Sequence, residues 1–212
     1  HTRSASDWSS DVCSSDLSKG GKTTVSFTNP DYFNYAYLQG DAGKSSNLRK
    51  INADVKAVFR SMGSLRGFGG RLEAKKLVKY RYMVGMEGFK NPVELQTFSS
   101  FKTGVSKIQK DLKQKEGKTQ LVYSIVDEKN QVAIFGIGLL NKDKGEPHFL
   151  PIIGEDHVAA MPYEIVMIGK EATMLHGRFR IALHWPELTM GTFSKIMSTP
   201  GDIKDLLKAL TE

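Results

Sequence analysis

Two apolar runs joined by a short polar turn constrain the fold of this chain more than any other feature. Residues 119–126 read TQLVYSIV, residues 131–140 read QVAIFGIGLL, and DEKN lies between them. β-Branched and aromatic residues on either side of a polar turn are typical of a β-hairpin. Since both arms are apolar along most of their length, we expect both to lie in the middle of a sheet.

Four further segments have the composition of strands. Residues 163–168 and 173–185 are joined by the turn-like sequence GKEA, which predicts a second antiparallel pair. In residues 77–86 the apolar and aromatic side chains alternate with basic ones, as in a half-buried strand. Residues 23–28, TTVSFT, are the fourth segment, and the following Asn-Pro-Asp ends it.

Three segments repeat apolar residues at helical spacing. The first begins at Ser46, an expected N-cap, and ends before Gly63; the second covers residues 101–112. The third begins with Thr199 as the expected N-cap and Pro200 as the first helical residue. Strands that come as hairpins, with helices between the groups, predict an α+β fold. We expect an antiparallel sheet of about five or six strands packed against two or three amphipathic helices.

The first 17 residues differ in composition from the rest of the chain. They are rich in Ser and Asp, and residues 7–17, DWSSDVCSSDL, can be encoded by the DNA of a common sequencing-library adapter. We therefore expect residues 1–17 to be a non-native, disordered segment and residues 18–212 to form a single domain. The one cysteine, Cys13, lies in the first segment, so the domain offers no disulfide and no thiolate ligand or nucleophile. The compartment stays open, because a signal peptide upstream of Ser18 is compatible with a chain that lacks an initiating Met.

The charge of the chain permits an anionic partner. Hydrophobic residues make up 40% and charged residues 25%, as in ordinary globular proteins, and no apolar run approaches the roughly 20 residues of a membrane-spanning helix. The formal net charge is +7 and the pI is about 9.4. This balance is compatible with binding to nucleic acid, to anionic lipid or to another polyanion.

Two glycine-containing stretches invite comparison with binding motifs. Residues 18–25, SKGGKTTV, lack the spacing of a phosphate-binding loop, so we expect no nucleotide cofactor. Residues 66–71, RGFGGR, resemble one copy of an RGG-type RNA-binding segment, which makes Arg66 and Arg71 candidate contacts for a polyanion. A glycine-rich loop between a helix and a strand is the alternative interpretation.

The expected strand over residues 173–185 carries the main group of candidate ligand-binding residues. Alternation places His176, Arg178, Arg180 and His184 on one face, opposite an apolar face. Arginine offers a bidentate fork and histidine a titrating donor, so this face is suited to a carboxylate or a phosphate. It is not a metal site, because the two histidines would lie roughly 26 Å apart on a strand that rises about 3.3 Å per residue. A solvated face of a basic protein is the alternative interpretation.

The only compact acid–histidine group is Glu155-Asp156-His157. Asp156 could orient His157 as a general base, but no Ser or Cys nucleophile stands in a recognisable elbow and no metal-ligand spacing accompanies the group. We therefore predict a non-enzymatic binding or interaction domain, without a metal or cofactor, whose partner is an anionic ligand or a protein. The alternatives are a polyanion-binding protein, for nucleic acid or anionic lipid, and a hydrolase that uses Asp156 and His157.

Overall fold

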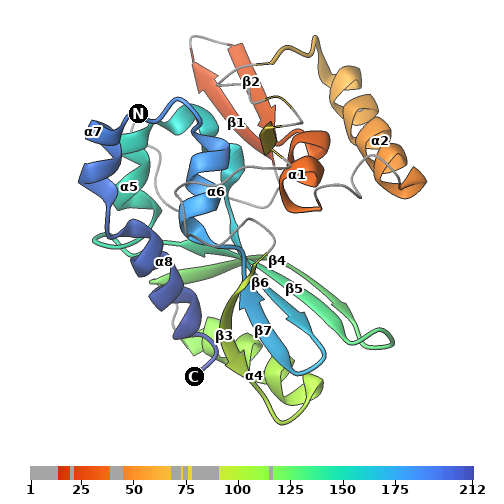
Figure 1. Ribbon diagram of the computed structural model, residues 1–212, viewed down its shortest axis with the longest axis vertical. Helices are drawn as coiled ribbons and strands as arrows, with labels where there is room; N and C mark the ends of the chain where they lie inside the picture. Colours follow the sequence, from red (N-terminus) through yellow and green to blue (C-terminus); the bar gives the residue numbers. More distant parts are fainter. Residues whose placement is uncertain are drawn as a thin grey trace.

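The centre of the molecule is a five-stranded antiparallel sheet. The structure is a computed structural model, and it describes residues 14–19, 22–38, 45–67, 73, 76–77, 91–114 and 117–212. The strand order is β3-β7-β6-β5-β4, and every neighbouring pair is antiparallel (Figure 1). The strands are β3 (Val93–Thr97), β4 (Thr119–Asp127), β5 (Val132–Leu139), β6 (Tyr163–Ile168) and β7 (Glu171–Met174). An antiparallel sheet with separate helices confirms the predicted α+β fold class.

The predicted hairpin forms β4 and β5, in a register that pairs Asp127 with Val132 and Thr119 with Leu139. Our expectation that both arms lie inside the sheet is right for β5 and wrong for β4, which is an edge strand among the described residues. The reason is topological. The chain returns after β5 to place β6 on the far side of β5, and no strand within the described residues pairs with the outer side of β4.

One face of the sheet, the core face, packs against the helices. The core face of β5 consists of Ala133, Phe135, Ile137 and Leu139, all of them buried. Helices α4, α5 and α8 contribute further buried residues to the same cluster. Their bounds are Phe101–Gln114 for α4, Glu146–Ile153 for α5 and Thr199–Lys208 for α8. A short 3-10 helix, η3 (Glu155–Ala160), links α5 to the segment before β6.

The N-terminal part of the chain builds a smaller unit above the sheet (Figure 1). Strands β1 (Ser14–Lys19) and β2 (Lys22–Phe27) form an antiparallel pair, followed by helices α1 (Pro30–Tyr37) and α2 (Ser46–Met62). Residues 14–17 belong to the segment that we expected to be disordered, and their backbone lies in β1, where it pairs with β2. Residues 1–13 lie outside the described residues.

The predicted helices are present, with their caps displaced by one residue. The N-cap of α2 is Ser45, whose side chain accepts a hydrogen bond from the Leu48 N–H, and Gly63 is the C-cap. Helix α8 is preceded by Ser198, so Thr199 lies in its first turn. No helix in the described part of the chain is long and apolar enough to cross a membrane.

The prediction of a strand over residues 173–185 is wrong after the first residues. Strand β7 ends at Met174, and residues Gly177–His184 form helix α6. The helix is surrounded on several sides, so that Phe179 and Leu183 pack in one hydrophobic cluster while Ile181 packs in the main core. These three odd-numbered residues produce an alternating pattern that resembles a strand although the backbone is helical.

Of the predicted strand over residues 77–86, the structure describes only its first residue. Leu77 is helical and is buried beside Ala36 of α1 and Phe179 of α6. Residues 78–86 lie outside the described residues, and the prediction for them stays untested. Strand β3 was missed by the sequence analysis, because five residues with few apolar side chains carry little periodic signal.

A row of side chains on the face opposite the core face depends on a glycine. Gly136 of β5 faces Tyr123 of β4 on one side and Glu164 of β6 on the other. A Cβ atom on Gly136 would overlap the Tyr123 ring, so the absence of a side chain lets this ring lie over β5. The Tyr123 hydroxyl donates a 3.5 Å hydrogen bond to Oε1 of Glu164.

Replacing Gly136 with Ala is expected to destabilise the protein by about 1–3 kcal/mol, because the new methyl group displaces the Tyr123 ring. Gly138→Ala is the matched control on the same face of the same strand, since its Cβ would have its nearest contact at 3.7 Å. Urea denaturation of both variants measures the difference. Equal stability of the two variants would contradict this role for Gly136.

Candidate functional site

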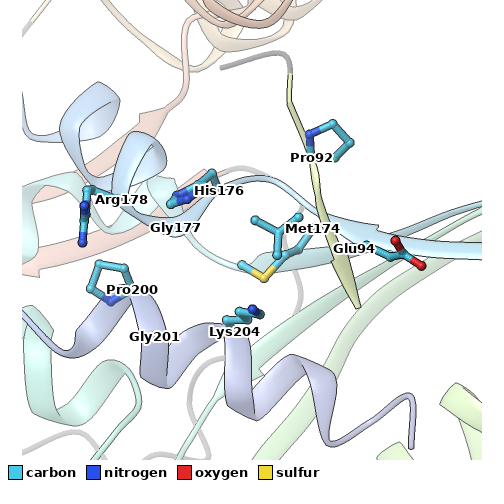
Figure 2. Close-up of a pocket in the computed structure, with 10 residues that line it drawn as sticks. Pro92, Glu94, Met174, His176, Gly177, Arg178, Pro200, Gly201 and Lys204 are labelled. Carbon is cyan, nitrogen blue, oxygen red and sulfur yellow. The ribbon is translucent and has the colours of Figure 1, made fainter. Parts of the chain in front are cut away.

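A pocket of about 520 Å³ lies where β3, the end of β7 and the first turns of α6 and α8 meet (Figure 2). Strand β7 supplies Met174, and the chain then enters α6 through His176. Helix α8 comes from the far C-terminal end of the chain. The lining residues are Pro92, Val93, Glu94, Met174, His176, Gly177, Arg178, Pro200, Gly201 and Lys204.

Three basic side chains line this pocket. His176 is the N-cap residue of α6, Arg178 lies in the first turn of α6, and Lys204 lies in α8. Figure 2 shows that His176 and Arg178 come from one side of the pocket and Lys204 from another. Because these residues belong to two helices that are far apart in sequence, only the folded chain brings them together.

The beginnings of two helices meet at the same place. Gly177 opens α6, and a Cβ atom there would lie 3.4 Å from Cα of Pro200 in the first turn of α8. The starts of the two helices are therefore in van der Waals distance of each other. A helix N-terminus carries a partial positive charge, so both helix ends add to the positive potential of Arg178 and Lys204.

The remaining lining of the pocket is mostly apolar. Met174 is buried at the end of β7, and Val93 and the two prolines complete the apolar lining. The one acidic side chain, Glu94, accepts a 2.9 Å hydrogen bond from the Thr97 hydroxyl of its own strand. Figure 2 shows its carboxylate directed away from His176 and Arg178. The pocket thus offers cationic groups on one side and apolar surface beside them.

The structure separates the candidate residues that sequence analysis placed on one sheet face. His176 and Arg178 line the pocket, whereas Arg180 is buried with 4% of its surface exposed and His184 is half-buried toward α1. The physical reason is the helix, in which Arg178 and Arg180 differ by roughly 200° in direction. The prediction of one shared binding face is therefore wrong.

The candidate residues of the RGFGGR stretch lie outside the pocket lining. Arg66 follows α2 and is exposed, and Arg71 lies outside the described residues. The sequence analysis missed Lys204, Met174 and Glu94 as pocket residues. The sequence feature that could have pointed to Lys204 is the Pro-Gly pair at the start of α8. This pair marks a helix N-terminus one turn before Lys204.

The side chain of Arg180 is buried in the interior of the protein, where polar groups of the chain hold its guanidinium. Its guanidinium forms an ion pair with Glu164 of β6, and its Nη2 donates 2.6 Å hydrogen bonds to the carbonyl oxygens of Ala160 and Pro162. The guanidinium also lies 4.6 Å from the ring centroid of Tyr163. Although burial alone lowers the pKa of Arg180, the adjacent Glu164 carboxylate raises it above its usual value, so the residue stays charged.

Burial shifts the pKa values of two other titratable groups near Arg180 toward their neutral forms. The pKa of His184 is lowered well below its usual value by burial and then by the charge of Arg180, and its ring packs 4.9 Å from that of Phe33. Burial raises the pKa of Glu146, at the start of α5, to about 7, although its Oε1 accepts a 2.9 Å hydrogen bond from the Leu139 N–H. A neutral His184 cannot supply the positive charge that we expected of it.

The proposed general base His157 has a different acidic neighbour. Its Nε2 lies 2.6 Å from Oε1 of Glu187, and its ring centroid lies 5.6 Å from that of Trp185. The side chain of Asp156 lies outside the described residues. In the part of the chain that the structure describes, no three His, Cys, Asp or Glu side chains gather in a way that could hold a metal ion.

Comparison of the chain with models of known protein families, with curated proteins and with solved structures finds no match. The pocket and its neighbours are therefore interpreted from their own chemistry.

Removing the buried guanidinium is expected to cost about 3–5 kcal/mol, because Arg180→Met leaves Glu164 without its partner and two carbonyl groups without their donor. The double variant Arg180→Met/Glu164→Leu is expected to recover part of this loss, since it removes both charges. Arg178→Met, in the same helix, is the control and should change stability by less than about 1 kcal/mol. Chemical denaturation measures all three, and a mild effect of Arg180→Met would contradict a structural role.

Glu146 is expected to make the protein less stable as the pH rises. The pKa of Glu146 in the folded protein is about 7, above the ordinary value of 4.5. Between these pH values the folded state binds more protons than the unfolded state, so the free energy of unfolding falls as the pH rises from about 4.5 to about 7. Glu146→Gln keeps an acceptor for the Leu139 N–H without the charge. The variant should match the wild type at pH 5 and exceed it by roughly 1–3 kcal/mol at pH 8. Urea midpoints at both pH values test this, and parallel losses in the two proteins would contradict it.

Proposed function

We propose that this domain is a non-enzymatic binding domain whose pocket takes a small ligand with an anionic head and an apolar body. The observation that carries the proposal is the convergence of His176, Arg178 and Lys204 on one pocket that also borders two helix N-termini. A carboxylate or a phosphate matches such a site, because arginine binds either with two parallel hydrogen bonds and backbone N–H groups favour negative charge.

The apolar part of the pocket supports the second half of the proposal. Val93 and Pro92 provide surface without hydrogen-bonding side-chain groups next to the basic side, and the buried Met174 lies behind them. A bare inorganic ion would leave this surface in contact with water. Ligand pockets that combine a few convergent polar groups with an apolar lining generally hold organic molecules.

We expect phenyl phosphate or benzoate to bind more tightly than inorganic phosphate or acetate, because only the aromatic ligands cover the apolar lining. Isothermal titration calorimetry with these four probes measures the affinities. Arg178→Ala and Lys204→Ala should each weaken the binding of phenyl phosphate by about tenfold, which corresponds to about 1.4 kcal/mol.

Lys170→Ala is the matched control, because Lys170 is an exposed lysine in the turn between β6 and β7 and does not line the pocket. Its affinity should equal that of the wild type. Equal weakening by Lys170→Ala and Lys204→Ala would reveal a general charge effect, and the absence of any binding at millimolar concentration would refute the proposal. Tight binding to a random nucleic acid that Lys204→Ala leaves unchanged would favour the polyanion alternative instead.

A further inference from the structure

The contact between helices α1 and α6 is built from aromatic and apolar side chains. Ala36 of α1 and two residues of α6, Phe179 and Leu183, belong to one buried cluster. Four aromatic residues of α1 pack in or against this cluster: Tyr32, Phe33, Tyr35 and Tyr37. The hydrophobic effect stabilises such a contact, and a charge introduced into it without a partner destabilises it.

One titratable ring, that of His184, lies at this contact. His184 is the last residue of α6, and its ring centroid lies 4.9 Å from that of Phe33 in α1. Although the residue as a whole is half-buried, its Nε2 is shielded from water and has no hydrogen-bond partner among the described residues. A nitrogen in this situation gains hydrogen bonds to water when the contact opens.

The charged groups around His184 oppose its protonation. Burial, then the positive charge of Arg180 in the same helix, and then His157 of η3 lower the pKa of His184 well below its usual value. The nearby carboxylates already have cationic or titrating partners, because Glu164 pairs with Arg180 and Glu187 with His157. Neither carboxylate is therefore left to balance a charge on His184.

Helix α1 brings no acidic side chain to the contact. Its one acidic residue, Asp31, lies in the first turn and accepts hydrogen bonds from Asn52 and Lys56 of α2, at 2.5 and 3.3 Å. Burial raises the pKa of Tyr37, near Arg180, so this hydroxyl also stays neutral. The contact is thus suited to a neutral imidazole and not to a charged one.

We propose that the contact between α1 and α6 is an acid-sensitive joint, in which protonation of His184 separates α1 from α6 and exposes the aromatic cluster between them. In the closed contact a charged imidazole would lie beside Arg180 and away from water, whereas water solvates it in the open state. Each pH unit below the ordinary histidine value of about 6.5 therefore favours the open state by about tenfold, until the closed contact also binds the proton. The joint is independent of the proposed ligand, since the pocket borders the opposite end of α6.

Hydrogen exchange of the α1 backbone amides at pH 7.5 and pH 5.0, corrected for the intrinsic exchange rates, tests the joint. An eight-residue helix is too short to persist alone in water, so its amides exchange once it leaves α6. Their protection, including that of the Leu38 N–H that donates a 2.9 Å hydrogen bond to the Asn34 carbonyl, should fall by about 30-fold between the two pH values. Glu146 cannot cause this loss, because its raised pKa stabilises the whole fold as the pH falls.

His184→Phe and His184→Gln both remove the titrating group, and in both the α1 protection should change by less than about threefold. His148→Gln is the matched control, because His148 lies in α5, outside the cluster between α1 and α6, and this variant should behave as the wild type does. Unchanged α1 protection in the wild type, or a 30-fold fall that persists in both His184 variants, would overturn the proposal. Equal protection of α1 and β5 at pH 5.0 would overturn it as well, because α1 would then open only when the whole fold unfolds.

Discussion

A charged group buried in a protein has to replace its water shell with fixed partners, and the guanidinium of Arg180 meets this requirement with three groups from residues 160–164. Glu164 supplies a carboxylate from β6, and Ala160 and Pro162 supply carbonyl oxygens from η3 and the segment that follows it. Since Arg180 belongs to α6, these bonds fix α6 against the sheet. The position of His176, at the start of the same helix, follows from that attachment.

The same ion pair is linked to the edge strand β4. Glu164 also accepts a hydrogen bond from Tyr123, whose ring crosses Gly136 to reach it. The edge strand β4, the central strand β6 and helix α6 are thus linked by one row of polar groups in an otherwise apolar interior. A buried pair of this kind adds less stability than an equally well packed apolar group, but it allows few alternative arrangements of its partners, because a displaced charge has no water to receive it.

The sequence predicted most of the regular structure whose burial pattern is simple. The hairpin of β4 and β5 and helices α2, α4 and α8 each have one dominant period, and the structure contains all of them. Helix α6 was missed because its odd-numbered apolar residues are shared between two hydrophobic clusters, which imitates the period of a strand. The edge position of β4 could not be predicted either, since a periodic pattern reports which faces are apolar and says nothing about how many neighbours the strand has.

For the candidate site, residue type alone identified His176 and Arg178 but placed them on the wrong surface. Two arginines that a strand would direct to one face point to opposite sides of a helix, so Arg178 reaches the pocket while Arg180 enters the interior. The charge of Arg180 is matched by Glu164, and the charge of Arg178 faces a pocket whose lining also contains Lys204. Helix α6 thus joins the interior to the pocket, because its interior side holds it in place and its first turn borders the pocket.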